Sequence, residues 1–292
     1  MRLLAVMALA AIVIGATSGC ATRPGPAQPE AIDRGPAPAY AEVASRYNAR
    51  VADTERIWAR ATTRIWYTDD KGEDQSDQAD GHLAYIAPRQ VLLTIERFGE
   101  TYAILGSDAE RYWWISLAEA DRGAIVGAHE QTTPEAALRA GLPVHPLDLL
   151  ALIGVAPLPA EGAVTWSDDG RRLIVVTSGR WGPIRLELDP GSAEPAAVAL
   201  LRDGQIAISS ALTEFTPYAR RDQPSDVRLP GEVMVTVHDT GTRIRMNLSD
   251  YRAWGRRPNA AMFDLESQLR GNRIAPEQIR RVEDVLAGAA QP

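Results

Sequence analysis

The sequence is poor in the residues from which buried catalytic and metal sites are commonly built. Among 292 residues it has one cysteine, Cys20, and four histidines that show no zinc-like spacing. A single thiol cannot form an internal disulfide, so the fold must be stabilised by burial of the apolar residues, which make up 45% of the chain. We therefore expect one large domain that binds no metal and no cofactor.

Catalytic motifs are also missing. The sequence contains no Gly-x-Ser-x-Gly turn, no P-loop and no Rossmann glycine pattern. Isolated carboxylates such as Glu96 and Glu187 are typical of solvated strand positions, and no second group accompanies them to form an acid–base pair. The sequence therefore indicates a protein that is not an enzyme, with no catalytic residues.

The charge balance excludes another class of function. The formal net charge is −7, whereas a broad nucleic-acid-binding surface needs a basic face that neutralises phosphates. Lys71 is the only lysine, and the remaining basic residues are arginines. We expect no nucleic-acid partner.

The first residues are typical of an export signal. Arg2 is followed by the apolar run Leu3–Ile14, which is too short to span a bilayer, and then by the small residues that precede Cys20. This end resembles the bacterial lipobox, and the resemblance implies a signal peptide over residues 1–19 and acylation of Cys20, for example by palmitate. An ordinary secretory signal with an incidental cysteine is the alternative.

Two segments follow the expected lipidation site. Residues 20–39 are rich in Pro, Ala and Gly, and such a composition predicts a flexible tether. Ala21 is not acidic, which by the sorting rule of diderm bacteria implies an outer-membrane lipoprotein facing the periplasm. Residues 40–292 are expected to be a single domain, and we expect this domain to be monomeric.

The domain begins with helical periodicity and continues with strands. Apolar residues recur at helical spacing between residues 40 and 60, which predicts an amphipathic helix whose apolar side packs on the core. Alternation of apolar and polar residues then predicts antiparallel strands joined by short turns such as Asp203-Gly204. The expected strands centre on residues 63–67, 83–85, 91–95, 102–105, 111–117, 164–166, 173–176, 184–188, 198–201, 206–212, 233–237 and 244–248.

Three other segments have their own patterns. The acidic run 69–80 has a spacing unlike that of an EF-hand, so a solvated hairpin loop is favoured over a calcium site. Thr133-Pro134-Glu135 and the apolar run Pro146–Ile153 predict two helices of an insert between the strands, and a last helix is expected to begin at Pro276.

Two stretches carry a resemblance to a known superfamily. The first is Gly81–Arg89, continued by Val91–Ile95 and Ser107–Trp113, and the second runs from Leu229 to Leu248 and is followed by Ala261–Leu265. They resemble the lipoprotein carrier and receptor superfamily that includes LolA and LolB. The resemblance implies an α+β, mostly antiparallel fold: a strongly curved half-open β-barrel with covering helices, whose concave side can hold acyl chains.

The expected cavity leads to a hypothesis of function. A curved sheet with apolar inner residues would bind an acyl chain or a lipoprotein, as in envelope lipid or lipoprotein trafficking. The same residues could instead fill a closed core, and the protein would then be a scaffold or assembly lipoprotein that binds a partner protein through a sheet edge or through Trp66 and Trp114. The residues expected to line the cavity are Leu83, Tyr85, Leu93, Ile95, Trp113 and Ile115.

Overall fold

The computed structural model describes residues 32–284 apart from residues 70, 143, 219–226 and 254–259. The expected signal peptide, the lipidation site Cys20 and residues 20–31 of the expected tether therefore lie outside the described residues. All elements named below belong to one compact unit, Ala31–Pro292. No helix of this described part is both long and apolar enough to cross a membrane.

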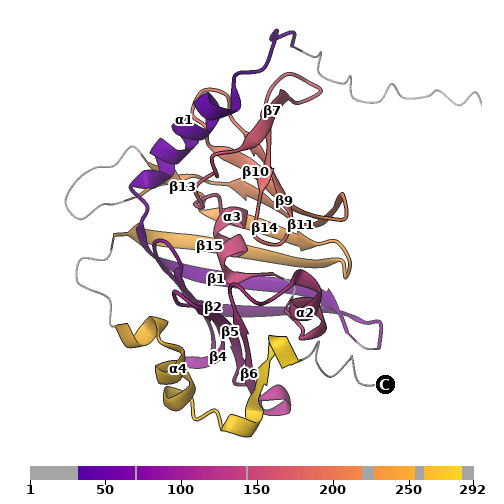
Figure 1. Cartoon of the computed structure of the whole chain (residues 1–292). Helices are drawn as coiled ribbons and strands as arrows, with labels where there is room; N and C mark the ends of the chain where they lie inside the picture. Colours follow the sequence, from indigo (N-terminus) through magenta and orange to yellow (C-terminus); the bar gives the residue numbers. More distant parts are fainter. Residues whose placement is uncertain (1–31, 70, 143, 219–226, 254–259, 285–292) are drawn as a thin grey trace, which may run out of the picture. The chain divides into compact units, whose positions relative to one another are not determined.

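One large sheet of 14 strands dominates the domain (Figure 1). Its strand order is β16-β6-β5-β4-β3-β2-β1-β15-β14-β11-β10-β9-β8-β7, and β16–β6 is its parallel pair. The strands are β1 (Arg56–Thr68), β2 (Asp74–Ile86), β3 (Gln90–Arg97), β4 (Glu100–Ser107), β5 (Arg111–Ser116), β6 (Gly123–Ala128), β7 (Gly162–Trp166), β8 (Leu173–Ser178), β9 (Pro183–Leu188), β10 (Pro195–Arg202), β11 (Gln205–Thr213), β14 (Glu232–Val237), β15 (Thr242–Arg252) and β16 (Ile279–Arg281), with β12 (Thr216–Pro217) and β13 (Arg228–Leu229) in a separate pair.

The helices are short apart from the first. They are α1 (Tyr40–Ala52), α2 (Pro134–Arg139), α3 (Pro146–Leu152) and α4 (Leu265–Gly271), with the 3₁₀ turns η1 (Glu119–Asp121), η2 (Ala260–Phe263) and η3 (Pro276–Gln278). Thr133 caps α2 by accepting a hydrogen bond from the backbone N–H of Ala136, and a proline opens both α2 and α3. The two helices expected between the strands are thus confirmed.

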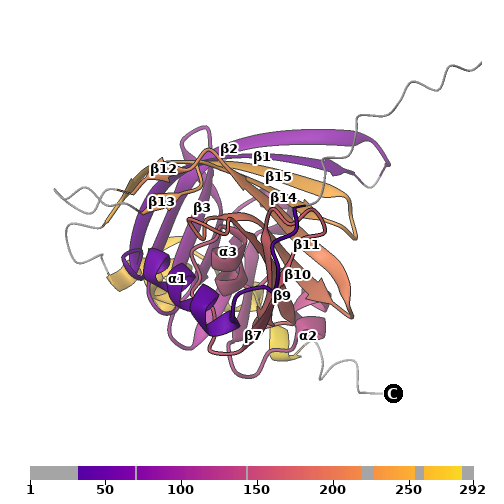
Figure 2. The ribbon, with the colours of Figure 1, turned by 90° about the horizontal axis from the view of Figure 1, so that it is seen from above.

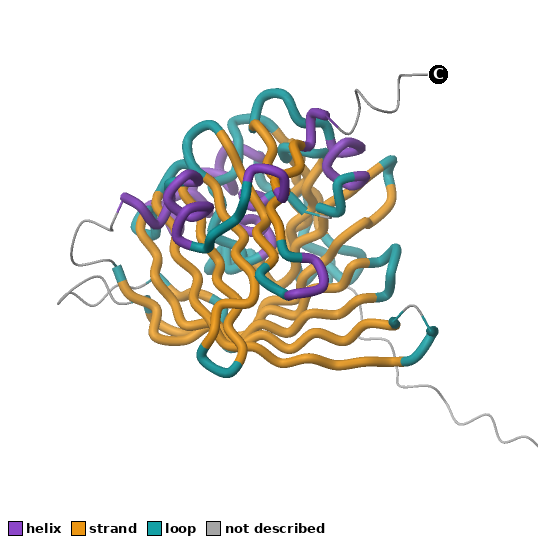
Figure 3. The backbone as a smooth tube through the Cα atoms, turned by 90° about the horizontal axis from the view of Figure 1, so that it is seen from below, coloured by secondary structure: helices purple, strands orange, loops and turns teal. Residues whose placement is uncertain are grey.

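The sheet is strongly curved and does not close, because β7 and β16 are edge strands that do not pair with each other. Figure 2 shows the strands as a bent wall with α1 and α3 on its inner side, and Figure 3 shows the bend of the strands from below. The expected fold class, a mostly antiparallel half-open barrel with covering helices, is confirmed. The inner face of the sheet is apolar because apolar and polar residues alternate along its strands. In β1, for example, Ile57, Ala59 and Ala61 are buried on one face.

The outer face of β3–β6 is covered as well. Phe263, Leu265 and Leu269 from η2 and α4 form a second core cluster with residues of this face, including Trp113 and Ile115. A Cβ atom on Gly106 of β4 would lie 2.4 Å from the ring of Trp113, so the indole occupies the space that this glycine leaves. Both faces of these strands are therefore buried.

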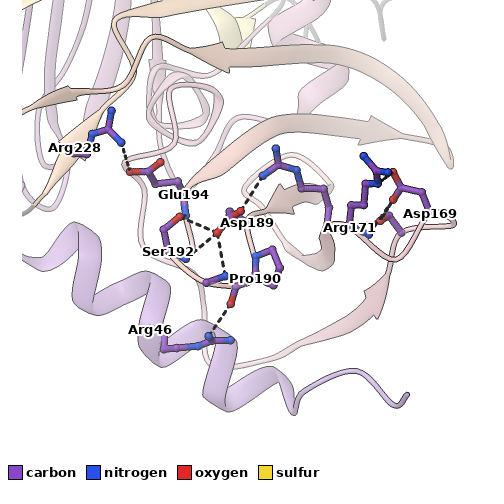
Figure 4. Close-up of polar contacts among 11 residues, drawn as sticks. Arg46, Asp169, Arg171, Asp189, Pro190, Ser192, Glu194 and Arg228 are labelled. Carbon is purple, nitrogen blue, oxygen red and sulfur yellow. Dashed lines mark hydrogen bonds and ion pairs between the residues drawn. The ribbon is translucent and has the colours of Figure 1, made fainter. Parts of the chain in front are cut away.

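Polar contacts hold α1 across the open side of the curve. Arg46 donates a hydrogen bond to the carbonyl oxygen of Pro190 at 2.9 Å, in the turn between β9 and β10 (Figure 4). Asp189 orders this turn by accepting from the backbone N–H groups of Gly191 and Ser192, which lower the pKa of its carboxyl group. The buried side chains Val43, Ala44, Tyr47 and Val51 point into the main core.

Two expected helices differ from the structure. The helix expected over residues 40–60 ends at Ala52, and from Arg56 the chain is strand β1. Thr54 stops the helix by donating its hydroxyl to the carbonyl oxygen of Val51 at 2.7 Å. The helix expected from Pro276 is a 3₁₀ turn followed by strand β16, because residues 279–281 pair with the edge strand β6; helical backbone begins only at Val282.

The end of the expected tether is attached to the domain. The backbone N–H of Ile32 donates to the carbonyl oxygen of Asp169 at 3.0 Å, and Arg34 donates to that of Gly170 at 3.3 Å. Arg34 also lies over the ring of Trp166. Residues 32–34 therefore contact the turn between β7 and β8.

Candidate ligand-binding cavity

An apolar cavity of about 290 Å³ lies on the inner side of the sheet. Strands from both halves of the sheet, the α2–α3 connection and α3 enclose it. Thr63 is the one lining residue with a polar side-chain oxygen among the residues described. Its lining residues are Thr63, Ile65, Leu93, Ile95, Leu105, Trp114, Gly141, Leu142, Val144, Leu149, Leu152, Ile208, Val235, Val237, Ile244 and Met246.

Strand register places these side chains together. In one half of the sheet Leu93 pairs with Leu105, which pairs with Trp114, so all three point to the same face. In the other half Ile65 pairs with Ile244, which pairs with Val235. The curvature brings these two rows toward each other, and the space between them is the cavity.

Helix α3 covers this space. Leu149 and Leu152, three residues apart on one side of the helix, face the cavity. The hydroxyl of Ser210 on β11 donates to the carbonyl oxygen of Leu152 at 2.6 Å and fixes the end of the helix to the sheet. Helix α3 is thus hydrogen-bonded to the sheet that it covers.

The start of α3 is held by two buried histidines. The backbone N–H of Leu147 donates to Nδ1 of His145 at 3.1 Å, so the ring proton of His145 is on Nε2. The Nε2–H of His145 donates to Nδ1 of His129 at 3.0 Å, and Nε2 of His129 donates to the carbonyl oxygen of Asp108 at 3.0 Å. Each of the four ring nitrogens of His129 and His145 thus has one hydrogen-bond partner, and both imidazoles are neutral.

The surroundings of the histidines favour the neutral state. The rings of Tyr112 and Trp181 lie 4.5 Å and 5.0 Å from that of His145, centroid to centroid. Burial lowers the pKa of His145 to about 2 and also lowers that of His129. Burial raises the pKa of Asp148, in the first turn of α3, to about 6. These groups lie beside the cavity and not among its lining residues.

The structure divides the six residues expected to line the cavity into three pairs. Leu93 and Ile95 line it. Leu83 and Tyr85 are on the same face but are buried in the main core next to it. Trp113 and Ile115 are on the opposite face, in the cluster that packs on α4, and Trp114 lines the cavity in their place.

Sequence reasoning named only two of the sixteen lining residues, Leu93 and Ile95, and missed the opposite wall altogether. Val235, Val237, Ile244 and Met246 come from the β14–β15 hairpin, and their alternation was visible in the sequence. Their position opposite Leu93 depends on pairing between β1 and β15, which are far apart in the chain. Alternation gives the buried face of a strand, but it does not identify the strands that will lie opposite.

The cavity has the chemistry of a site for an apolar ligand. Its lining has no carboxylate, imidazole or amine that could act as an acid, base or nucleophile, and the described residues contain no group of three or more His, Cys, Asp or Glu side chains suited to a metal ion. Its volume is near the lower end of the range of small-molecule pockets, about 300–1,000 Å³. Such a site binds by removing apolar surface from water.

Comparison with known proteins gives information at the level of the fold. No family model and no curated protein matches the sequence. A solved putative outer membrane lipoprotein-sorting protein domain from Vibrio parahaemolyticus superposes with a TM-score of 0.52 at 12% identity, covering 76% of this chain and 94% of its own. A LolA superfamily protein from Nitrosomonas europaea gives 0.50 at 12% identity, with 79% and 99% covered.

The domain has a LolA-like fold. The superposition covers almost the whole of both solved structures. The family resemblance expected from the two sequence stretches is therefore confirmed for the fold. In this LolA-like domain the cavity lies on the concave side of the sheet, under α3.

Proposed function

We propose that the protein is an envelope lipoprotein that is anchored by acyl groups on Cys20 and binds one apolar chain, an acyl chain of a lipid or lipoprotein, in the cavity under α3. The observation that carries this proposal is the cavity itself: a curved sheet whose concave apolar side chains enclose about 290 Å³ instead of filling it. A filled core would favour the scaffold function. The proposed activity is binding and not catalysis.

The fold comparison supports the envelope context. One of the solved neighbours is described as an outer membrane lipoprotein-sorting protein domain and another as a LolA superfamily protein. Together with the export signal and Ala21, this favours an outer-membrane anchor with the domain in the periplasm. The trafficking of lipids or lipoproteins is the process that such a location and such a cavity serve.

The scaffold alternative named a sheet edge or Trp66 and Trp114 as its binding surface, and the two tryptophans have contacts within the domain. The guanidinium groups of Arg64 and Arg243 lie over the ring of Trp66, at 5.1 Å and 5.8 Å from its centre. Trp114 lines the cavity.

Uptake of a fluorescent fatty acid by the chain from Ala21 onwards, which contains the whole compact unit and lacks the anchor, tests the proposal. We expect saturable binding with the blue-shifted emission of a probe in an apolar site. A folded protein that leaves the probe in water would contradict it.

A further inference from the structure

A second open space adjoins the apolar cavity. It is a groove of about 530 Å³ over β5, β6 and the β16 edge. Trp114 on β5 and Gly141 after α2 line both the groove and the apolar cavity. The two spaces therefore adjoin each other at Trp114 and Gly141.

The groove differs from the cavity in chemistry. Where the cavity is apolar, the groove has two arginines, two carboxylates and two uncharged polar side chains: Arg122, Arg280, Asp121, Glu277, Ser116 and Gln278. Most of them already have partners. Asp121 accepts from the hydroxyl of Ser116 at 2.8 Å, and Arg122 donates to the carbonyl oxygen of Asn272 at 2.6 Å. Gln278 accepts from the backbone N–H of Ala275 at 2.9 Å.

Glu277 and Arg280 are the charged groups of the groove that remain available. Within the described residues neither side chain forms a hydrogen bond or an ion pair, with each other or with any neighbour. Arg280 pairs in register with Ile125 of β6, another groove residue, which places it on the groove side of the edge strand. One unpaired cation and one unpaired anion thus line the same groove.

The geometry points to a zwitterionic amphiphile as the ligand: its apolar chain lies in the cavity, and its head group, an anionic phosphate joined to an ammonium, lies in the groove beside Arg280 and Glu277. This inference rests on the proposed function, because it assigns the polar end of the same ligand. A head group of one charge would leave one of the two side chains without a partner and facing a like charge.

Competition by single-chain lipids that differ only in the head group tests the inference. The chain from Ala21 onwards is loaded with the uncharged probe N-phenyl-1-naphthylamine. The probe is displaced by lysophosphatidylethanolamine, lysophosphatidylglycerol or monoacylglycerol of one chain length, below their micelle concentrations. The zwitterionic lipid is expected to bind about fivefold more tightly than the other two, a difference of about 1 kcal/mol.

A double variant and a matched control assign the effect to the groove. Glu277→Gln combined with Arg280→Gln keeps the net charge and is expected to remove the preference while leaving monoacylglycerol affinity unchanged. Arg281→Gln combined with Asp284→Asn makes the same charge change at exposed residues outside the groove lining and is expected to keep the preference.

The outcomes separate the two proposals. Equal affinity for all three lipids, or a preference that survives the groove variant, would overturn the inference and leave the proposed function intact. Failure of the probe and of monoacylglycerol to bind to the folded protein would contradict the proposed function itself, and with it the inference.

Discussion

Nε2 of His145 lies 3.0 Å from Nδ1 of His129, so one neutral imidazole donates to another inside the domain. Both side chains belong to buried residues, and Arg180 donates to the backbone carbonyl oxygen of His129 at 3.1 Å. Protonation of His129 would place two N–H groups against each other, and protonation of His145 would remove the acceptor that caps α3. The position of the cavity's cover thus depends on both rings remaining neutral.

The first prediction is a loss of stability in acid. The folded pKa of His145 lies below that of the unfolded chain, about 6.5, so below that pH the unfolded state binds a proton that the folded state does not. Stability is complete above pH 6.5 and falls as the pH is lowered toward the folded value. For one histidine the loss between pH 7 and pH 5 is roughly 2 kcal/mol, measurable by urea denaturation.

A variant isolates this contribution. His145→Asn keeps a side chain that can cap α3 but does not titrate, so its free energy of unfolding should fall less steeply with acid than that of the wild type. Asp148 acts in the opposite direction, because its raised pKa makes the folded state bind a proton more readily below pH 6. Asp148→Asn should therefore steepen the loss, and identical pH profiles for all three proteins would refute this explanation.

The second prediction separates the two tryptophans of β5. Trp113→Ala should lower the free energy of unfolding by about 3–5 kcal/mol, because it empties the buried space over Gly106. Trp114→Ala should cost less stability, since Trp114 is half-buried, and should alter probe binding at the cavity. Urea denaturation and probe titration of both variants check this, and a reversed order of effects would show that the faces are assigned incorrectly.

The third prediction concerns the cavity wall. Val237→Glu places a carboxylate in the apolar lining, and uptake of a fluorescent fatty acid should weaken by more than about tenfold. Thr236→Glu is the matched control, because the neighbouring residue of β14 is also half-exposed but lies on the other face. Equal uptake by the two folded variants would count against binding at this site.

The fourth prediction concerns the expected anchor. Cys20→Ser removes the only thiol and should release the protein from membranes, since about 0.8 kcal/mol for each buried methylene of two or three acyl chains makes the normal anchor effectively permanent. Fractionation after a high-salt wash measures the result. A variant that stays with the membrane would refute lipidation at this residue, and recovery of the wild type in the inner membrane would refute outer-membrane sorting by Ala21.

Most of the sheet could be predicted because alternation is a local signal. Strands such as β9 and β15 have one apolar and one polar face, and turns such as Asp203-Gly204 adopt the positive φ angles, 50° and 77°, that tight hairpins require. The C-terminal elements were harder. Strand β16 has three residues and forms only because β6 offers an open edge, which no local pattern reveals.

The face of β5 could not be predicted for a related reason. Tyr112, Trp113, Trp114 and Ile115 are consecutive apolar residues, so the strand shows no alternation. Apolar side chains of β5 point to both faces. Trp113 and Ile115 pack in the outer cluster with α4, whereas Trp114 lines the cavity and Tyr112 packs with Trp181 on the inner face. Where both faces of a strand are covered, the sequence identifies the strand and not its orientation.

The central claim is that the cavity under α3 holds an apolar chain, and lipid extraction tests it most directly. The chain from Ala21 onwards is exported behind a cleavable signal peptide without a lipobox and purified without detergent. It is then extracted with organic solvent, and the extract is analysed by mass spectrometry against the amount of protein. The cavity predicts an acyl lipid that co-purifies with the wild type and is depleted in Val237→Glu but not in Thr236→Glu. A well-folded wild-type protein that yields no lipid and takes up no fatty acid would contradict the claim.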